Sequence, residues 1–138
     1  QWGRDGLILN ARSQNAAVKA RIIARSNNGG ESWQEEYADP QLPDPVCQGS
    51  MMNLGTKGKK QRLAFCNAAD TIYRNHLTLH LSKDGGRSWK KHILIEKGVD
   101  PKRDPTAYSD IVQLNKKEMG VLYERNNYSS ICFTVVRF

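Results

Sequence analysis

The sequence predicts an all-β fold, and three observations support this prediction. Short runs in which apolar and polar residues alternate recur along the chain, as expected for half-buried strands. Clusters of Gly, Pro, Asn and Asp separate these runs, and no segment keeps a helical period, not even the alanine-rich stretch 14–20. The third observation is a duplicated octet, because Ser26–Trp33 returns as Ser82–Trp89 at an offset of 56 residues. A repeat at fixed spacing indicates that whole structural units are repeated.

Ten strands are expected in chain order, each bounded by turn-forming residues. The first octet connects the second and third strands, and the second octet connects the sixth and seventh. Proline-containing segments at 40–45 and 101–105 separate three groups of strands. The expected strands cover residues 7–12, 18–25, 34–37, 49–54, 61–67, 76–82, 90–95, 108–114, 119–124 and 130–137.

Each octet contains the residues of a tight turn between two strands. Asn28 or Asp84 supplies a side-chain oxygen that accepts backbone hydrogen bonds and closes an Asx-type turn. The glycines that follow adopt positive φ without steric cost. The closing tryptophan is expected to anchor the hairpin as a buried indole. These positions are therefore predicted to be scaffold and not catalytic: Ser26, Asn28, Gly30, Trp33, Ser82, Asp84, Gly86 and Trp89.

The two octets resemble the Asp box, a repeat found in sialidases and related β-propeller proteins. The first copy departs from the pattern because Asn28 stands where the box has Asp. An amide keeps the acceptor oxygen, so the turn is expected to form in both copies. Other glycosidases and sorting receptors also carry the Asp box, so this repeat implies a fold without fixing a function.

The strand groups match the blades of a propeller, which are four-stranded antiparallel sheets of about 40–50 residues. We expect an incomplete blade over residues 1–40, a complete blade over 45–98 and an incomplete blade over 104–138. The first is expected to lack its innermost strand and the last its outermost strand. The chain should therefore form about three blades of a larger propeller and need the remaining N-terminal blades as partners.

The composition limits the classes of function. Lys and Arg number 21 against 14 acidic residues in a chain of 138, for a net charge of +7. The longest basic cluster, 57–60 with Arg62, is broken by Gly58, so no nucleic-acid partner is expected. A positive field suits an anionic substrate. No run approaches the ~18 apolar residues of a membrane span, so no span is expected in this segment.

No metal site and no other cofactor are expected. The three cysteines, Cys47, Cys66 and Cys132, are irregularly spaced and form no CxxC motif, and the three histidines have no partners at metal-ligand spacing. Cys66 and Cys132 lie in apolar strand runs, so both are expected to be small buried hydrophobic residues.

Four polar residues stand at the ends of apolar strands. Arg12 closes the run 7–12, Arg74 precedes 76–82, Tyr108 opens 108–114 and Glu124 closes 119–124. Because corresponding strand ends of successive blades converge on the axis of a propeller, these side chains are expected to share one pocket. Each of them alone would also fit a solvated or packed surface residue. The prediction therefore depends on the whole set and on its order relative to the two octets.

This set resembles the C-terminal half of the sialidases, which are exo-glycosidases with a six-bladed propeller. The resemblance covers nearly the whole chain and favours the cellular and bacterial enzymes over the viral ones. It is carried by the segments 5–12, 74–79, 107–110 and 122–124. The loop 44–50 also resembles the family loop that lines the sugar pocket, and Gln48 and Asp110 are further pocket candidates.

The resemblance implies a role for each of the four residues. Arg12 and Arg74 would bind the substrate carboxylate as two members of an arginine triad, since guanidinium groups bind carboxylates in a planar, bidentate way. Tyr108 would be the nucleophile of a retaining mechanism, in which sialidases use Tyr instead of Asp or Glu. A neutral phenol avoids repulsion from the negatively charged anomeric centre. Glu124 would hold the first arginine of the triad in place.

The implied function is that of an exo-α-sialidase acting on terminal sialic acids of sialylated glycoconjugates. Nothing in the chain matches the family's first triad arginine, its acid/base aspartate or the glutamate that activates the tyrosine, so this segment alone is expected to be inactive. Two alternatives remain: a catalytically silent lectin that binds sialic acid on the same propeller, and another Asp-box protein such as a different glycosidase or a sorting receptor. Lysosomal, secreted and cytoplasmic locations all remain open.

Overall fold

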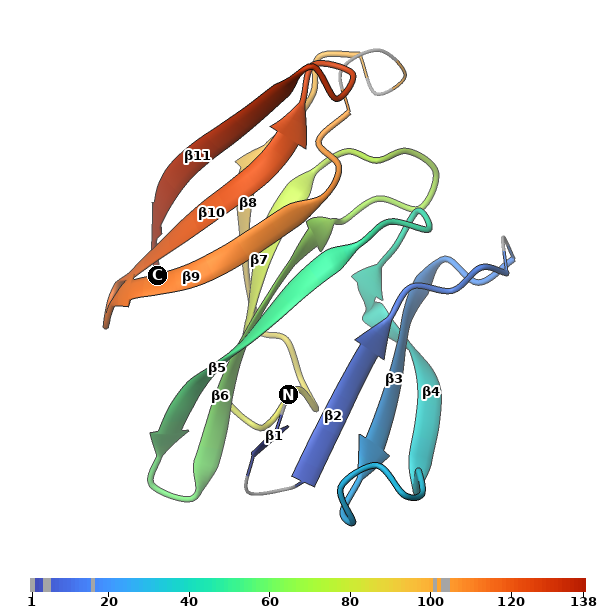
Figure 1. Ribbon diagram of the computed structural model, residues 1–138, viewed down its shortest axis with the longest axis vertical. Helices are drawn as coiled ribbons and strands as arrows, with labels where there is room; N and C mark the ends of the chain where they lie inside the picture. The colour runs from blue at the N-terminus through green and yellow to red at the C-terminus, as the bar shows by residue number, and fades with distance from the viewer. Residues whose placement is uncertain (1, 4–5, 16, 101, 103–104) are drawn as a thin grey trace.

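The computed structural model describes residues 2–3, 6–15, 17–100, 102 and 105–138, which form three antiparallel sheets (Figure 1). These residues contain strands and no helix, and hence no helix long and apolar enough to cross a membrane. The all-β prediction is confirmed.

Each sheet is a meander in which strands adjacent in sequence pair with one another, as in a propeller blade. The first sheet contains β1 (Trp2–Gly3), β2 (Gly6–Ala11), β3 (Ala20–Ser26) and β4 (Glu35–Pro43). The second contains β5 (Gly49–Lys57), β6 (Lys60–Ala68), β7 (Leu77–Ser82) and β8 (Lys91–Glu96). The third contains β9 (Ser109–Asn115), β10 (Glu118–Arg125) and β11 (Ser130–Arg137). Figure 1 shows the second sheet, green to yellow, between the blue first sheet and the orange-red third sheet.

The first sheet differs from the expectation at both of its edges. It was expected to lack an innermost strand, yet β1 pairs with β2 through Trp2↔Leu7 and Gly3↔Gly6. A strand of two residues is too short to show alternation, so the sequence pattern could not reveal it. At the other edge, β4 continues to Pro43, beyond the expected blade boundary at residue 40. The prolines there suggested a turn, but an edge strand accommodates proline because one side of it donates no ladder hydrogen bonds.

Two hydrophobic cores join the sheets, and β6 contributes to both. Leu63 and Phe65 of β6 pack toward the first sheet, in a cluster with Ile8, Ile23, Leu42 and Trp89. Ala64 and Cys66 pack toward the third sheet, in a larger cluster that includes Leu77, Leu79, Ile111, Met119 and Val121. Because successive side chains of a strand point to opposite faces, β6 is buried almost along its whole length. Cys66 is buried as predicted, whereas Cys132 on the outer strand β11 is only half-buried, so its predicted burial is wrong.

Both Asp boxes form the predicted turns at the end of a strand. In each, the serine hydroxyl donates to the Asx oxygen at 2.8 Å and accepts the N–H of the second glycine at 2.8 Å. Trp89 is 2% exposed because its indole packs in the core between the first and second sheets. Trp33 is 42% exposed, so the prediction of a buried indole is wrong for this copy. The first sheet covers Trp89, whereas no sheet among the described residues covers Trp33.

Candidate active site

Three of the predicted site residues, one from each sheet, meet at the same end of the molecule. Arg12 follows β2 and its Nη1 donates a hydrogen bond to the hydroxyl of Tyr108 at 3.1 Å. Arg74 precedes β7, and its guanidinium carbon lies 5.3 Å from the centre of the Tyr108 ring. Tyr108, immediately before β9, is 38% exposed. A phenol that water can reach therefore lies between two cationic groups.

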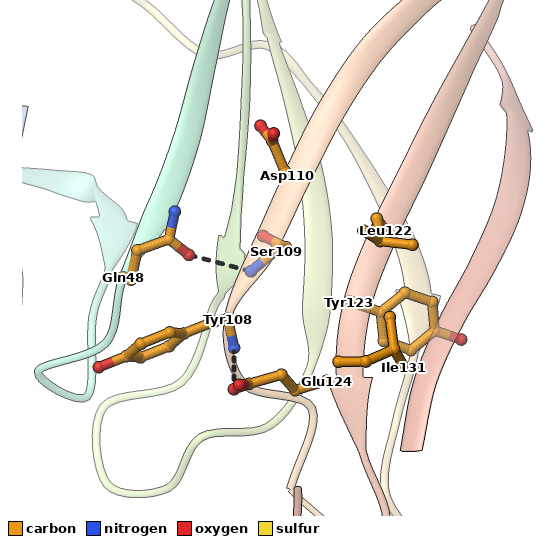
Figure 2. Close-up of a pocket in the computed structure, with 8 residues that line it drawn as sticks. All are labelled: Gln48, Tyr108, Ser109, Asp110, Leu122, Tyr123, Glu124 and Ile131. Carbon is orange, nitrogen blue, oxygen red and sulfur yellow. Dashed lines mark hydrogen bonds between the residues drawn. The ribbon is translucent and has the colours of Figure 1, made fainter.

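Glu124, at the end of β10, holds the backbone of Tyr108. The Tyr108 N–H donates to Glu124 Oε2 at 3.2 Å, and the Glu124 N–H donates to the Tyr108 carbonyl at 2.9 Å. Figure 2 shows the Glu124 carboxylate turned toward the Tyr108 N–H, while the Tyr108 ring projects toward the side of Gln48. Glu124 thus fixes the position of Tyr108 through its main chain and does not contact its hydroxyl in this structure.

The two weaker pocket candidates lie on different sides of Tyr108. Gln48 is half-buried, and its Oε1 accepts a hydrogen bond from the Ser109 N–H at 2.9 Å (Figure 2). The exposed carboxylate of Asp110 points away from Tyr108 in Figure 2 and accepts the Ile111 N–H at 2.9 Å. Gln48 therefore braces the strand that follows Tyr108, whereas Asp110 is not part of the cluster around the phenol hydroxyl.

Two shallow hollows flank the Tyr108 ring. One, of about 380 Å³, is lined by Asn10, Ala11, Arg12, Arg21, Gln48, Gly49 and Tyr108. The other, of about 360 Å³, has a mainly apolar wall made by Gln48, Tyr108, Ser109, Asp110, Leu122, Tyr123, Glu124 and Ile131. Only the first of these two holds arginines, so it is the better candidate for binding an anion.

The loop that carries Arg74 is held by local and long-range hydrogen bonds. The carboxylate of Asp70 accepts two backbone N–H groups of this loop and lies 3.0 Å from Nδ1 of His76. Burial opposes ionisation of Asp70, but these hydrogen bonds outweigh it and lower its pKa below the usual value. The carbonyl of Arg74 accepts the N–H of Thr106 at 2.9 Å, which joins the loop to the segment leading to Tyr108. Arg74 and Tyr108 are therefore linked through backbone as well as side chain.

Burial makes Cys47, Cys66 and His80 unsuited to act as a nucleophile or as an acid or base, because it shifts the pKa of each. Burial raises the pKa of Cys47 to about 11 and that of Cys66 to about 12, so both are neutral thiols at physiological pH. Burial, with the neighbouring His92, lowers the pKa of His80 to about 3. No three His, Cys, Asp or Glu side chains gather as a metal site within the described ranges. The side chains in contact with the Tyr108 phenol are the guanidinium groups of Arg12 and Arg74.

Two residues beside the site were not expected from the sequence. Arg21 of β3 is 2% exposed and forms an ion pair with Asp44 at 3.1 Å. Burial lowers the pKa of Arg21, and the Asp44 carboxylate opposes that shift. Tyr128, in the β10–β11 turn, accepts a hydrogen bond from Arg74 Nη1 at 3.4 Å. The only sequence signal for Arg21 is that a charged residue stands two positions before Ile23, on a strand face that proves to be buried. No sequence signal points to Tyr128.

Comparisons with known proteins identify the family of the chain. Residues 2–122 match the family model described as a BNR repeat-like domain. The chain is 30% identical over 124 residues to a sialidase of Bacteroides fragilis and 28% identical over 125 residues to a sialidase of Micromonospora viridifaciens. These matches cover 86% and 87% of the chain but only 22% and 18% of those relatives.

Among solved structures, the Hadza microbial sialidase Hz136 superimposes on the whole chain with a TM-score of 0.81. The chain covers 26% of that structure at 24% identity, which supports the fold and not the activity. Since the family model spans most of the chain and the matched relatives and solved structure are sialidases, the chain belongs to the BNR repeat-like domains as a partial propeller of the sialidase family.

Proposed function

We propose that the protein containing this chain is an exo-α-sialidase that removes terminal sialic acids with retention of configuration, with Tyr108 as nucleophile. The observation that supports this most directly is the meeting of Arg12, Arg74 and Tyr108 from three sheets. The named sialidases among the relatives point to the same activity.

The two arginines suit a substrate that carries a carboxylate next to its reacting carbon, as sialic acid does. A guanidinium presents parallel N–H donors that match the two oxygens of a carboxylate, which a lysine ammonium cannot reproduce. Arg12 has only one hydrogen bond to the phenol among its described contacts and is exposed, so its remaining donors face solvent. Arg12 and Arg74 would orient the sugar with its anomeric carbon toward the Tyr108 hydroxyl.

Tyr108 suits the role of nucleophile because its hydroxyl is accessible while its backbone is fixed. A phenol approaches an anomeric centre that bears a carboxylate without the repulsion that an Asp or Glu nucleophile would meet. As the phenol loses its proton, negative charge develops on the oxygen to which Arg12 already donates at 3.1 Å. A hydrogen-bond donor that is already in place stabilises such a charge as it forms.

The remaining catalytic groups would come from further blades of the same propeller. Trp33 is 42% exposed, and the outer face of the third sheet exposes Val112, Leu122 and Phe133 at 49%, 47% and 59%. Exposed apolar faces of this kind are typical of surfaces that another element covers. The acid/base aspartate, the activating glutamate and the first arginine of the triad would lie on those further blades, so this segment alone should not turn over a sialoside.

The test is the release of free sialic acid from a fluorogenic sialoside by the whole protein. Tyr108→Phe should lower turnover about a thousandfold or more, since removal of a nucleophile leaves only binding and electrostatic contributions. Tyr37→Phe, which removes a phenol hydroxyl remote from the site, is the control and should keep full activity. Normal turnover by Tyr108→Phe would remove this residue from the nucleophile role. If the wild-type protein binds the sialoside without releasing sugar, the alternative of a catalytically silent lectin that binds sialic acid is the correct one.

A further inference from the structure

We propose that Arg21 is a positioning residue of this site: it clamps the loop 44–48 to the end of β2 and so sets the relative positions of Arg12 and Tyr108. This inference rests on the proposed sialidase function. It concerns a side chain that is 2% exposed and lies beneath the hollow lined by Arg12 and Tyr108.

The contacts of Arg21 show that its donors are used by the protein. Its Nε donates to Asn10 Oδ1 at 2.7 Å and its Nη2 to the Asn10 carbonyl at 3.3 Å. Its Nη1 donates to Asp44 Oδ1 at 3.1 Å and to the Cys47 carbonyl at 2.6 Å. Four of the five N–H groups of the guanidinium are therefore occupied, so Arg21 is suited to holding the loop and not to binding substrate.

One side of the clamp leads to Arg12 and the other to Tyr108. Asn10 precedes Arg12 by two residues on the same strand end. Cys47 is fully buried in a small cluster with Ala68 and Ala107, and Ala107 immediately precedes Tyr108. The next residue of the loop, Gln48, accepts the Ser109 N–H at 2.9 Å. The hydrogen bonds of Arg21 thus connect the backbone on both sides of the 3.1 Å contact between Arg12 and Tyr108.

The loop adopts a conformation that needs such support. Val46 has φ of +60°, a region that a β-branched residue rarely occupies. Strained backbone persists only where surrounding contacts determine it. Here the carboxylate of Asp44 accepts both the Arg21 guanidinium at 3.1 Å and the Cys47 N–H at 3.3 Å, which closes the loop around Val46. Loss of the clamp should let the loop relax and shift Gln48.

The same strand supplies a matched control. Arg25 lies four residues after Arg21 on the same face of β3, is 7% exposed and faces Glu35 at 3.5 Å. Its end of β3 leads into the first Asp box, away from Arg12. A buried arginine paired with a carboxylate is therefore present at both ends of one strand, and only one of the two contacts the candidate site.

The kinetic experiment compares Arg21→Lys with Arg25→Lys in the whole protein, with a fluorogenic sialoside as substrate. A lysine keeps the charge of Arg21 but cannot reach four acceptors, so we expect kcat/KM to fall about 10- to 100-fold, with a raised KM as well as a lowered kcat. Arg25→Lys can destabilise the fold, but it does not alter the site. It should therefore keep the wild-type KM, because partial unfolding lowers only the concentration of active enzyme. Asp44→Asn serves as the second variant if Arg21→Lys does not fold, and it should shift KM in the same direction.

A second readout needs no activity. Iodoacetamide should label Cys47 several-fold faster in Arg21→Lys than in the wild type or Arg25→Lys, with buried Cys66 as the internal reference in peptide mapping. Unchanged labelling, an unchanged KM, or equal effects of the Arg21 and Arg25 substitutions would each overturn the proposal. A wild-type protein without sialidase activity would refute the proposed function and the positioning role with it. The labelling would still show whether Arg21 holds the loop.

Discussion

The two Asp boxes share the hydrogen bonds that close their turns but have different surroundings. In the first, the Ser32 N–H donates to Asn28 Oδ1 at 3.1 Å; in the second, the Ser88 N–H donates to Asp84 Oδ1 at 2.8 Å. The serine that opens each turn makes the same contacts in both copies. The turn is therefore specified by its own residues and forms in both copies.

The closing tryptophans differ because burial depends on a neighbouring sheet. Trp89 lies against Gly86 and in one cluster with Ile8 of the first sheet, and it is 2% exposed. Trp33 lies near Gly30 in the same way but is 42% exposed. Hydrogen bonds therefore make the turn, whereas the stability gained from its tryptophan is supplied by the adjacent blade.

Substitution of the tryptophans should show the largest difference. We expect Trp89→Ala to lower the free energy of unfolding by about 3–5 kcal/mol, since it leaves a cavity between two sheets. Trp33→Ala in the same chain should cost less than about 1 kcal/mol because much of the ring is already in water. Urea unfolding of the two variants measures both values.

The whole protein extends this comparison. If a preceding blade covers the first sheet there, the cost of Trp33→Ala should rise toward that of Trp89→Ala. Equal costs in this chain alone would contradict the view that the neighbouring sheet makes the difference.

Removal of the Asx side chain should have the next largest effect. Asp84→Ala leaves the half-buried Ser88 N–H and the Ser82 hydroxyl without their acceptor, which should cost about 1–3 kcal/mol. The same change at Asn28 also leaves the buried Ser26 hydroxyl without its acceptor, but it should cost less, about 1 kcal/mol, since Ser32 is exposed and water can replace the acceptor of its N–H. Urea unfolding of the two variants provides the comparison, and a larger cost at Asn28 would refute it.

Acid should weaken the second box and leave the first unchanged. Partial burial opposes ionisation of Asp84, but hydrogen bonds from Ser88 and Ser82 outweigh it and hold its pKa below the usual value. A carboxyl group with a lowered folded-state pKa contributes stability above its unfolded pKa, and this is lost as the pH falls through the folded value. Asn28 does not titrate.

Hydrogen exchange of the Ser88 and Ser32 amides below about pH 4, corrected for intrinsic rates, measures this difference. Protection should fall at Ser88 alone. A parallel loss at Ser32 would indicate global acid unfolding instead.

The sequence predicted most of the fold because alternation and turn chemistry are local properties. The strands around Ile23, Leu79 and Val121 were found because each shows an alternating run between turn residues. The two-residue strand β1 was missed because it has no pattern to detect, and Trp33 was expected to be buried because its local sequence matches that of Trp89. Burial of a side chain depends on which sheet packs over it, and one octet contains no such information.

The candidate site likewise contains residues that the sequence predicted and residues that it missed. Arg12, Arg74 and Tyr108 stand out because they are polar groups at strand ends, in an order that resembles the sialidases, and the structure brings them together. Arg21 was missed because an arginine within an alternating strand has the same sequence signal whether it faces water or a buried carboxylate. Its contact with Asp44 spans 23 residues and exists only once the loop 44–48 has folded over β3.

The smallest effect is expected where the first box is converted to the consensus. Asn28 Nδ2 donates to Ser32 Oγ at 2.9 Å, whereas Asp84 accepts from Ser88 Oγ at 2.6 Å. In Asn28→Asp the Ser32 hydroxyl must turn to donate, and it can still accept from Gln34 Nε2, now at 2.8 Å. Since the turn is exposed, the free energy of unfolding at neutral pH should change by less than about 0.5 kcal/mol.

The informative result of this substitution is its pH dependence. With an aspartate in place, protection of the Ser32 amide should fall in acid as expected for Ser88, because a titrating acceptor has replaced a neutral one. If Asn28→Asp keeps the acid resistance of the wild-type turn, the hydrogen bonds of the carboxylate are not what stabilises an Asp box, and the likeness between the two copies would be one of backbone geometry alone.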